Sequence, residues 1–148
     1  MKNIIFFFIL FLSILSINAY PAELFQIVED GINIRSDATV MSTDLGHLKK
    51  GETIRVVGER YQWYKIILPK RFTCFVLKEH TVAVNELLVT VSAARLNARK
   101  EPSLDSEIMG TLEKGLVLRI VEKRGDWLET TCYPHVNGWV HSKFLKPK

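Results

Sequence analysis

Short stretches in which apolar and polar residues alternate recur along most of the chain. The segment 96–99 reads Leu-Asn-Ala-Arg, and the same period of two begins again at 32–35, 54–57 and 118–121. A period of two with many β-branched residues predicts short strands that are buried on one side. No segment beyond residue 20 carries the longer period of an amphipathic helix. The pattern therefore predicts an all-β fold.

Glycines separate these strand-like runs at regular places. Lys50-Gly51 and Lys114-Gly115 each stand between two runs, and Arg124-Gly125-Asp126 stands at a further tip. Glycine takes positive φ without steric cost, so tight turns are expected there and Gly115 in particular is predicted to have positive φ. Five short antiparallel strands in a segment of about 60 residues can bury their edges only by curling into a small barrel.

The chain contains an internal repeat with a period of 64 residues. Segments 32–76 and 96–140 align without a gap over 45 positions, and 12 of these are identical, including Trp63 with Trp127 and Gly51 with Gly115. Unrelated sequences of average composition would share about three. The repeat predicts two small domains with a joint within Glu79–Leu88.

The N-terminal segment has the pattern of a secretory signal. Lys2 precedes an apolar run from Ile4 to Ile17 that is short for a membrane span, and Ala19 is a suitable residue before a cut. Residues 1–19 are therefore predicted to be a signal peptide, with a mature chain that begins at Tyr20 and has no stable membrane span. An uncleaved anchor is the alternative.

The net charge of the chain is only weakly basic. The 148 residues carry a formal net charge of +4, and loss of Lys2 with the signal segment leaves about +3. This is compatible with an anionic polymer of the cell envelope, whereas nucleic-acid binding usually requires a concentrated basic face. No nucleic-acid partner is expected.

Two long motifs resemble a known family. The stretch LNARKEPSLDSEIMGTLEKGLVLRIVEKRGDWLET, followed by NGWVHSKFL, is similar to bacterial SH3 domains in its order of strands, Lys-Gly turn, Gly-x-Trp strand and final Gly-Trp-Val. The resemblance implies two tandem SH3-like barrels, at 24–81 and 87–146. The first copy departs further, since Cys74-Phe75-Val76 stands where Gly-Trp-Val is expected. The family often accompanies cell-wall peptidases, so the resemblance implies binding to peptidoglycan or its peptide stems.

Exposed aromatic and polar residues are the candidate ligand contacts, because flat rings stack on sugars and peptides. The candidates are Trp63, Trp127, Trp139, Asn97 and Arg99, together with Asn33 and Arg35 as first-copy counterparts. The second copy is expected to bind better, since it keeps both Trp127 and Trp139 where the first has Phe75 in place of the second ring. The alternative roles are half-buried packing for the tryptophans, loop contacts for the asparagines and ion pairs for the arginines.

Two cysteines leave two interpretations open. An exported protein could pair Cys74 with Cys132, and such a bridge would join the two copies because the two positions are not equivalent in the repeat. The alternative is two buried thiols that pack as small apolar groups.

The residue pattern gives little support for a catalytic site or a metal site. Cys132, His135 and His141 are the clustered soft ligands, and no fourth ligand follows at a usable spacing for zinc. Neither cysteine has a histidine base with a clear orienting group. We expect no enzyme activity, cofactor or metal.

The sequence thus predicts an exported, periplasmic or extracellular binding protein associated with the cell envelope. An adaptor that binds an envelope protein and modulates an enzyme is the competing hypothesis. The doubling either raises avidity, if both copies bind, or makes one copy a platform for the other.

Overall fold

A computed structural model describes residues 22–148, and this part of the chain is built from strands and two short 3-10 turns. The predicted all-β class is confirmed. The elements in chain order are β1 (Glu23–Ile27), β2 (Ile32–Arg35), β3 (Asp44–Leu48), β4 (Thr53–Arg60), β5 (Trp63–Ile67), β6 (Thr73–Leu77), η1 (Lys78–His80), β7 (Thr81–Ala83), β8 (Leu88–Val91), β9 (Arg95–Arg99), β10 (Ile108–Glu113), β11 (Val117–Arg124), β12 (Trp127–Thr131), β13 (Asn137–His141), η2 (Ser142–Phe144) and β14 (Leu145–Pro147).

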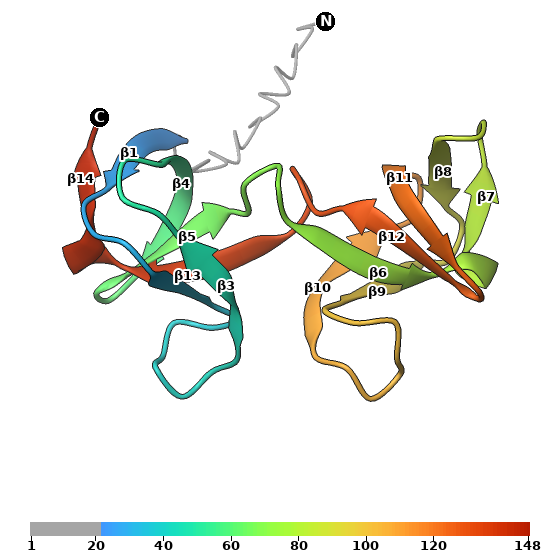
Figure 1. Ribbon diagram of the computed structural model, residues 1–148, viewed down its shortest axis with the longest axis horizontal. Coiled ribbons are helices and arrows are strands. Elements are labelled where there is room, and N and C mark those ends of the chain that lie inside the picture. The colour runs from blue at the N-terminus through green and yellow to red at the C-terminus, as the bar shows by residue number, and fades with distance from the viewer. Residues whose placement is uncertain (1–21) are drawn as a thin grey trace, which may run out of the picture.

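The strands form two curved antiparallel sheets that lie side by side (Figure 1). One sheet has the order β14-β1-β4-β5-β13-β2-β3, and we call it the first barrel. The other has the order β10-β9-β6-β12-β11-β8-β7, and we call it the second barrel. Each sheet therefore contains seven strands, five from one sequence copy and two from the other.

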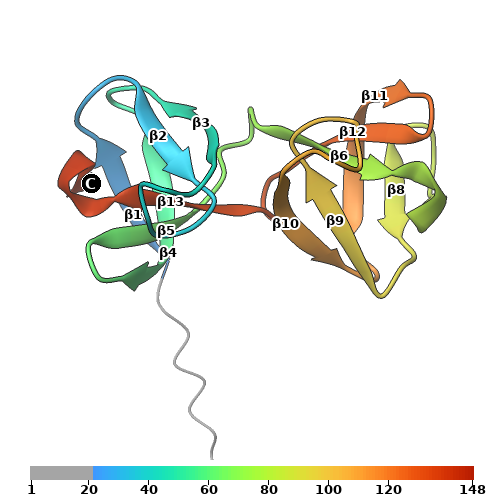
Figure 2. The ribbon, with the colours of Figure 1, turned by 90° about the horizontal axis from the view of Figure 1, so that it is seen from below.

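The two copies exchange their last strands. Strand β6 follows β5 in the chain, yet it pairs along its whole length with β12 and meets β9 at Phe75 and Arg99. Strand β13 follows β12, yet it pairs with β5 and meets β2 at Trp139 and Arg35. Both strands reach across the molecule to the barrel of the other copy (Figure 2). The terminal strands β7 and β14 follow them, pairing with β8 and β1.

The chain crosses between the barrels at 68–72 and again at 132–136. These two crossovers are equivalent in the repeat and bind one another through a reciprocal pair of backbone hydrogen bonds, from Leu68 N–H to Val136 O and from Cys132 N–H to Phe72 O, each at 3.0 Å. The predicted joint at Glu79–Leu88 lies between the two sequence copies, but it does not link the two barrels. It contains β7 and the turn into β8, and this hairpin belongs to the second barrel.

The alternation read from the sequence is present in the strands. In β2 and β9 the apolar residues are buried while Asn97 is exposed and Asn33, Arg35 and Arg99 are half-buried. Gly115 has φ +92° at the turn between β10 and β11, so the prediction of positive φ is confirmed.

The predicted signal peptide, and the predicted cut before Tyr20, lie outside the described residues. Within residues 22–148, no helix has the length and apolar character needed to cross a membrane.

Candidate functional site

A groove of about 290 Å³ opens on the first barrel beneath the loop that joins β2 to β3. Its lining comes from both sequence copies because the exchanged strand β13 brings the turn η2 to this barrel. The lining residues are Gly31, Ile32, Asn33, Arg35, Val40, Trp63, His141, Lys143 and Phe144. Among these described residues, none is acidic. The site is therefore composite, aromatic and basic.

Three rings form one wall of the groove. Trp63 begins β5 and pairs in register with His141 of β13. The centroids of these two rings lie 5.3 Å apart at 63°, and those of His141 and Phe144 lie 6.2 Å apart at 70°. Such edge-on arrangements are the favoured geometry of aromatic pairs, and they leave ring faces available to a flat or apolar ligand group.

Backbone hydrogen bonds hold η2 against the first copy. Ser142 N–H donates to Gln62 O at 2.8 Å, and Val28 N–H donates to Phe144 O at 3.1 Å. The Nδ1 atom of His141 accepts from Lys143 N–H at 3.3 Å, so a neutral His141 carries its proton on Nε2. The backbone of η2, which carries Lys143 and Phe144, is thereby fixed relative to Trp63.

Trp139 lies in the first barrel although the sequence assigns it to the second copy. It shares an outer face with Trp63, since β5 and β13 pair with Trp139 opposite Lys65. The guanidinium of Arg60 lies 4.8 Å from its ring centroid and also hydrogen-bonds Asp37. The backbone N–H of Ala38, with Arg60, lowers the pKa of Asp37. One ring face of Trp139 is thus already occupied by Arg60.

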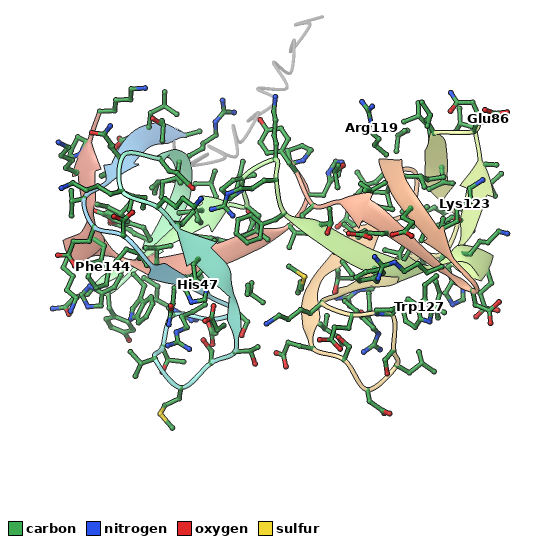
Figure 3. All side chains as sticks on the ribbon, viewed as in Figure 1. His47, Glu86, Arg119, Lys123, Trp127 and Phe144 are labelled. Atoms are coloured by element: carbon green, nitrogen blue, oxygen red, sulfur yellow. The ribbon has the colours of Figure 1, made fainter. Side chains whose placement is uncertain are left out.

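Trp127 occupies the equivalent of the Trp63 position in the second barrel. It pairs with Leu77, and Lys78 N–H donates to Asp126 O at 2.8 Å, as Ser142 does to Gln62 in the first barrel. Figure 3 shows Trp127 on the second barrel and Phe144 on the first. The predicted candidates Trp127 and Trp139 therefore do not share a site.

The predicted polar candidates have a structural role in part. Arg99 donates to Ser106 O at 2.8 Å, and Arg35 donates to Ser42 O at 3.1 Å. Each arginine thus holds the long loop of its own barrel through a backbone carbonyl, where the sequence suggested an acidic partner. Asn97 is exposed on β9, and Asn33 lines the groove of the first barrel.

Phe75, the first-copy counterpart of Trp139, is buried in the second barrel with 7% of its surface exposed. The guanidinium of Arg124 lies 5.3 Å from its ring centroid, matching the contact of Arg60 with Trp139. The replacement of tryptophan by Phe75 in the first copy therefore changes the second barrel. The first barrel has both Trp63 and Trp139.

Cys74 and Cys132 are free, fully buried and located in the core of the second barrel. The hydrogen bond with the Cys74 thiol, together with burial, raises the pKa of Cys132, so this thiol is protonated at neutral pH. A protonated, buried thiol is a poor nucleophile. Within residues 22–148, no group of three or more His, Cys, Asp and Glu side chains is placed to hold a metal ion.

Comparison with known proteins gives the family. Residues 30–81 and 94–146 each match the family described as Bacterial SH3 domain. The chain belongs to this family. It is also 25% identical over 151 aligned residues to the Bacillus subtilis (strain 168) protein named "Putative N-acetylmuramoyl-L-alanine amidase YrvJ". The alignment covers 96% of this chain and 29% of that protein, so the chain spans less than a third of its relative's length.

The resemblance to bacterial SH3 domains is therefore confirmed, with two copies in tandem along the sequence. In space each bacterial SH3 barrel is completed by the other copy, since the first match includes β6 and stops where β7 begins, and the second includes β13 and stops within β14. The activity in the relative's name is that protein's own and is not carried over to this chain.

Sequence reasoning missed His141, Lys143 and Phe144 as partners of Trp63. It kept the residues of each copy together, whereas the exchange brings the end of the second copy to the start of the first. The 64-residue repeat contained one signal of this site. It aligns His141, Lys143 and Phe144 with Leu77, Glu79 and His80, so the second copy has a basic residue in place of an acidic one and an aromatic ring in place of a leucine.

Proposed function

We propose that this chain is a non-catalytic binding protein of the bacterial cell envelope that recognises peptidoglycan or its peptide stems. Export through the signal segment 1–19, to the periplasm or outside the cell, is part of the proposal. The observation that carries it is the composite groove on the first barrel, in which Trp63, His141 and Phe144 form one wall of an open volume of about 290 Å³. Membership in the bacterial SH3 family supports the same ligand class.

The groove has the character of a peptide or sugar site. Ligand sites in proteins combine apolar and aromatic walls with a few placed polar groups. Here Val40 and Phe144 supply apolar surface, while Asn33 and Lys143 supply polar groups. The volume is at the small end for such sites, which suits a few atoms of a polymer in place of a large free ligand. Weak binding of this kind is sufficient for a protein that meets many identical sites on a wall.

A pull-down with purified sacculi tests the proposal. Trp63→Ala should weaken binding about two- to tenfold, because aromatic stacking contributes about 0.5–1.5 kcal/mol beyond buried area. Trp127→Ala, at the equivalent position of the second barrel, is the matched control and should have a smaller effect. Circular dichroism confirms that each variant is folded.

The opposite order of effects would place the binding site in the second barrel, as the sequence alone suggested. Failure of the parent protein to bind sacculi at all would overturn the proposal.

An adaptor that binds an envelope protein is favoured by one observation on the second barrel. Val82, Thr90 and Val117 pair in a row across β7, β8 and β11, and the two valines are 59% and 50% exposed. The equivalent row of the first barrel is polar, with Lys146, Gln26 and Thr53. An adaptor without wall affinity would leave the sacculi unbound.

A further inference from the structure

The two barrels have the same backbone frame around this site and opposite charges within it. In the first barrel His141 pairs with Trp63, and in the second Leu77 pairs with Trp127. Val28 N–H donates to Phe144 O at 3.1 Å, and Ser92 N–H donates to His80 O at 2.9 Å at the equivalent place. Between these matched contacts, the first barrel has Lys143 and the second has Glu79.

The basic groups of the first groove differ in their freedom to meet a ligand. Arg35 already donates to the loop carbonyl of Ser42, and His141 uses Nδ1 to accept from the backbone of Lys143. The ammonium of Lys143 lies 4.7 Å from the ring centroid of Phe144, on an exposed residue. Lys143 can therefore exchange its weak contact with Phe144 for an anionic group of a ligand without disturbing the frame.

The corresponding place on the second barrel would repel an anion. Glu79 is 71% exposed, with His80 Nε2 at 3.6 Å from its carboxylate, and it lines a pocket of about 350 Å³ with Leu77, Lys78 and Asp126. Two carboxylates face that pocket and one ammonium accompanies them. The exchange delivers η1 and η2 to opposite barrels, so the exchanged copy contributes Lys143 to the first groove and Glu79 to the second pocket.

We propose that the first groove selects a peptide that carries a carboxylate, with the carboxylate bound by Lys143 and the adjoining apolar part of the peptide against Trp63 and Phe144. This inference rests on the proposed function and names its ligand group. A carboxylate is favoured over the phosphates of an anionic polymer because the groove offers one ammonium with a replaceable contact, that of Lys143 beside the ring of Phe144. Tracking a polyanion requires several cations along one surface.

The experiment compares untreated sacculi with sacculi whose carboxyl groups have been converted to methylamides by carbodiimide coupling. The parent protein should bind the untreated sacculi and lose up to about fivefold in affinity on the amidated ones, since an exposed ion pair contributes at most about 1 kcal/mol. Lys143→Glu should lose at least as much on untreated sacculi. On amidated sacculi it should bind as the parent does.

Lys49→Glu changes the net charge equally, on an exposed residue of the first barrel outside the groove, and should bind like the parent. The difference between the parent and Lys143→Glu should shrink as salt is raised, because exposed charges are screened within about 10 Å at 0.1 M. Circular dichroism checks that each variant is folded.

The outcomes separate the two proposals. Equal binding of the parent to untreated and amidated sacculi overturns the carboxylate inference and leaves the wall-binding function in place. An equal loss for Lys49→Glu and Lys143→Glu overturns it too, since the effect would then be one of net charge. Absence of binding to either preparation overturns the proposed function and the inference with it.

Discussion

The two barrels share their strands and turns but differ in the core where the exchanged strand enters. In the first barrel, Gly138 of β13 lies directly against Ile34 and Leu68, and an added Cβ would collide with the Ile34 side chain. In the second barrel, the equivalent of Gly138 is Cys74 of β6, which is fully buried, and the equivalent of Ile34 is Ala98. Glycine thus lies against a large isoleucine in the first barrel, whereas the second barrel has a cysteine and an alanine at these two positions.

The two cores also differ in their polar contacts. Cys74 Sγ lies 3.5 Å from Thr130 Oγ1, and Thr130 is the buried polar residue of the second core. The first barrel has Ile66 at the position of Thr130 and Leu68 at the position of Cys132. If each copy kept its own last strand, Cys74 would crowd Ile34, Ile66 and Leu68 in one barrel, and Gly138 would leave a void beside Thr130 in the other. The comparison teaches that each exchanged strand is shaped for the barrel of the other copy.

The largest expected effect comes from separating the copies. The fragments 22–86 and 87–148 meet in the exposed turn between β7 and β8. Each fragment alone lacks two strands of its own barrel and should be largely unfolded, because small sheets with open edges are marginal in water. Mixing the two should restore the β-sheet signal in circular dichroism, with a 1:1 complex by sedimentation.

A stable, folded monomer of 87–148 would contradict this comparison. It would mean that the second copy can close on its own β13 and that the exchange is optional.

The next effect in size is Gly138→Cys, which places the side chain of the second barrel in the first. The new atoms would press on Ile34 and Leu68, and overpacking of this kind should lower the free energy of unfolding by about 2–3 kcal/mol. Urea denaturation of the chain measures it. In an Ile34→Ala background the added cost of the cysteine should fall below about 1 kcal/mol, since coupled neighbours do not add. An equal loss of stability from Gly138→Cys in both backgrounds would show that Ile34 is not the residue that requires glycine at position 138.

A smaller effect is expected at the turn between β10 and β11. Gly115 has φ +92°, and no atom lies within 4 Å of a built Cβ, so Gly115→Ala should cost about 1 kcal/mol through backbone strain alone. Thermal melts measure the change. Gly58→Ala is the control, because Gly58 lacks positive φ and its Cβ would meet only ordinary contacts with Lys65. An unchanged midpoint for Gly115→Ala would argue against a strained turn.

The smallest effect contrasts the hairpin tips of the two barrels. Tyr61 has φ 54° and is 94% exposed, whereas its counterpart Gly125 has φ 61° at a residue type that accepts this conformation. Tyr61→Gly should therefore raise the free energy of unfolding by about 0.5 kcal/mol, since relief of the strain outweighs the greater flexibility of glycine in the unfolded chain. A loss of stability would indicate that the tyrosine ring makes contacts that matter.

The strand exchange also places both cysteines in the same barrel. The sequence allowed a bridge that would join the copies, and both thiols lie in the second barrel because β6 is located there. A bridge would tie the exchanged strand to its host.

The sequence by itself determined the strands, the turns, the doubling and the family. Alternation at 32–35 and 96–99 marked the buried side of β2 and β9, and the glycine at 115 marked a turn, because these features depend on near neighbours in the chain. Only the tertiary structure decided which copy supplies the last strand of each barrel. The backbone hydrogen bonds between strands are the same whichever copy supplies the strand. The period of two therefore cannot show whether β6 or β13 completes a given barrel. The choice depends on contacts between residues far apart in sequence, such as Gly138 with Ile34, and it also brings Lys143 beside Trp63.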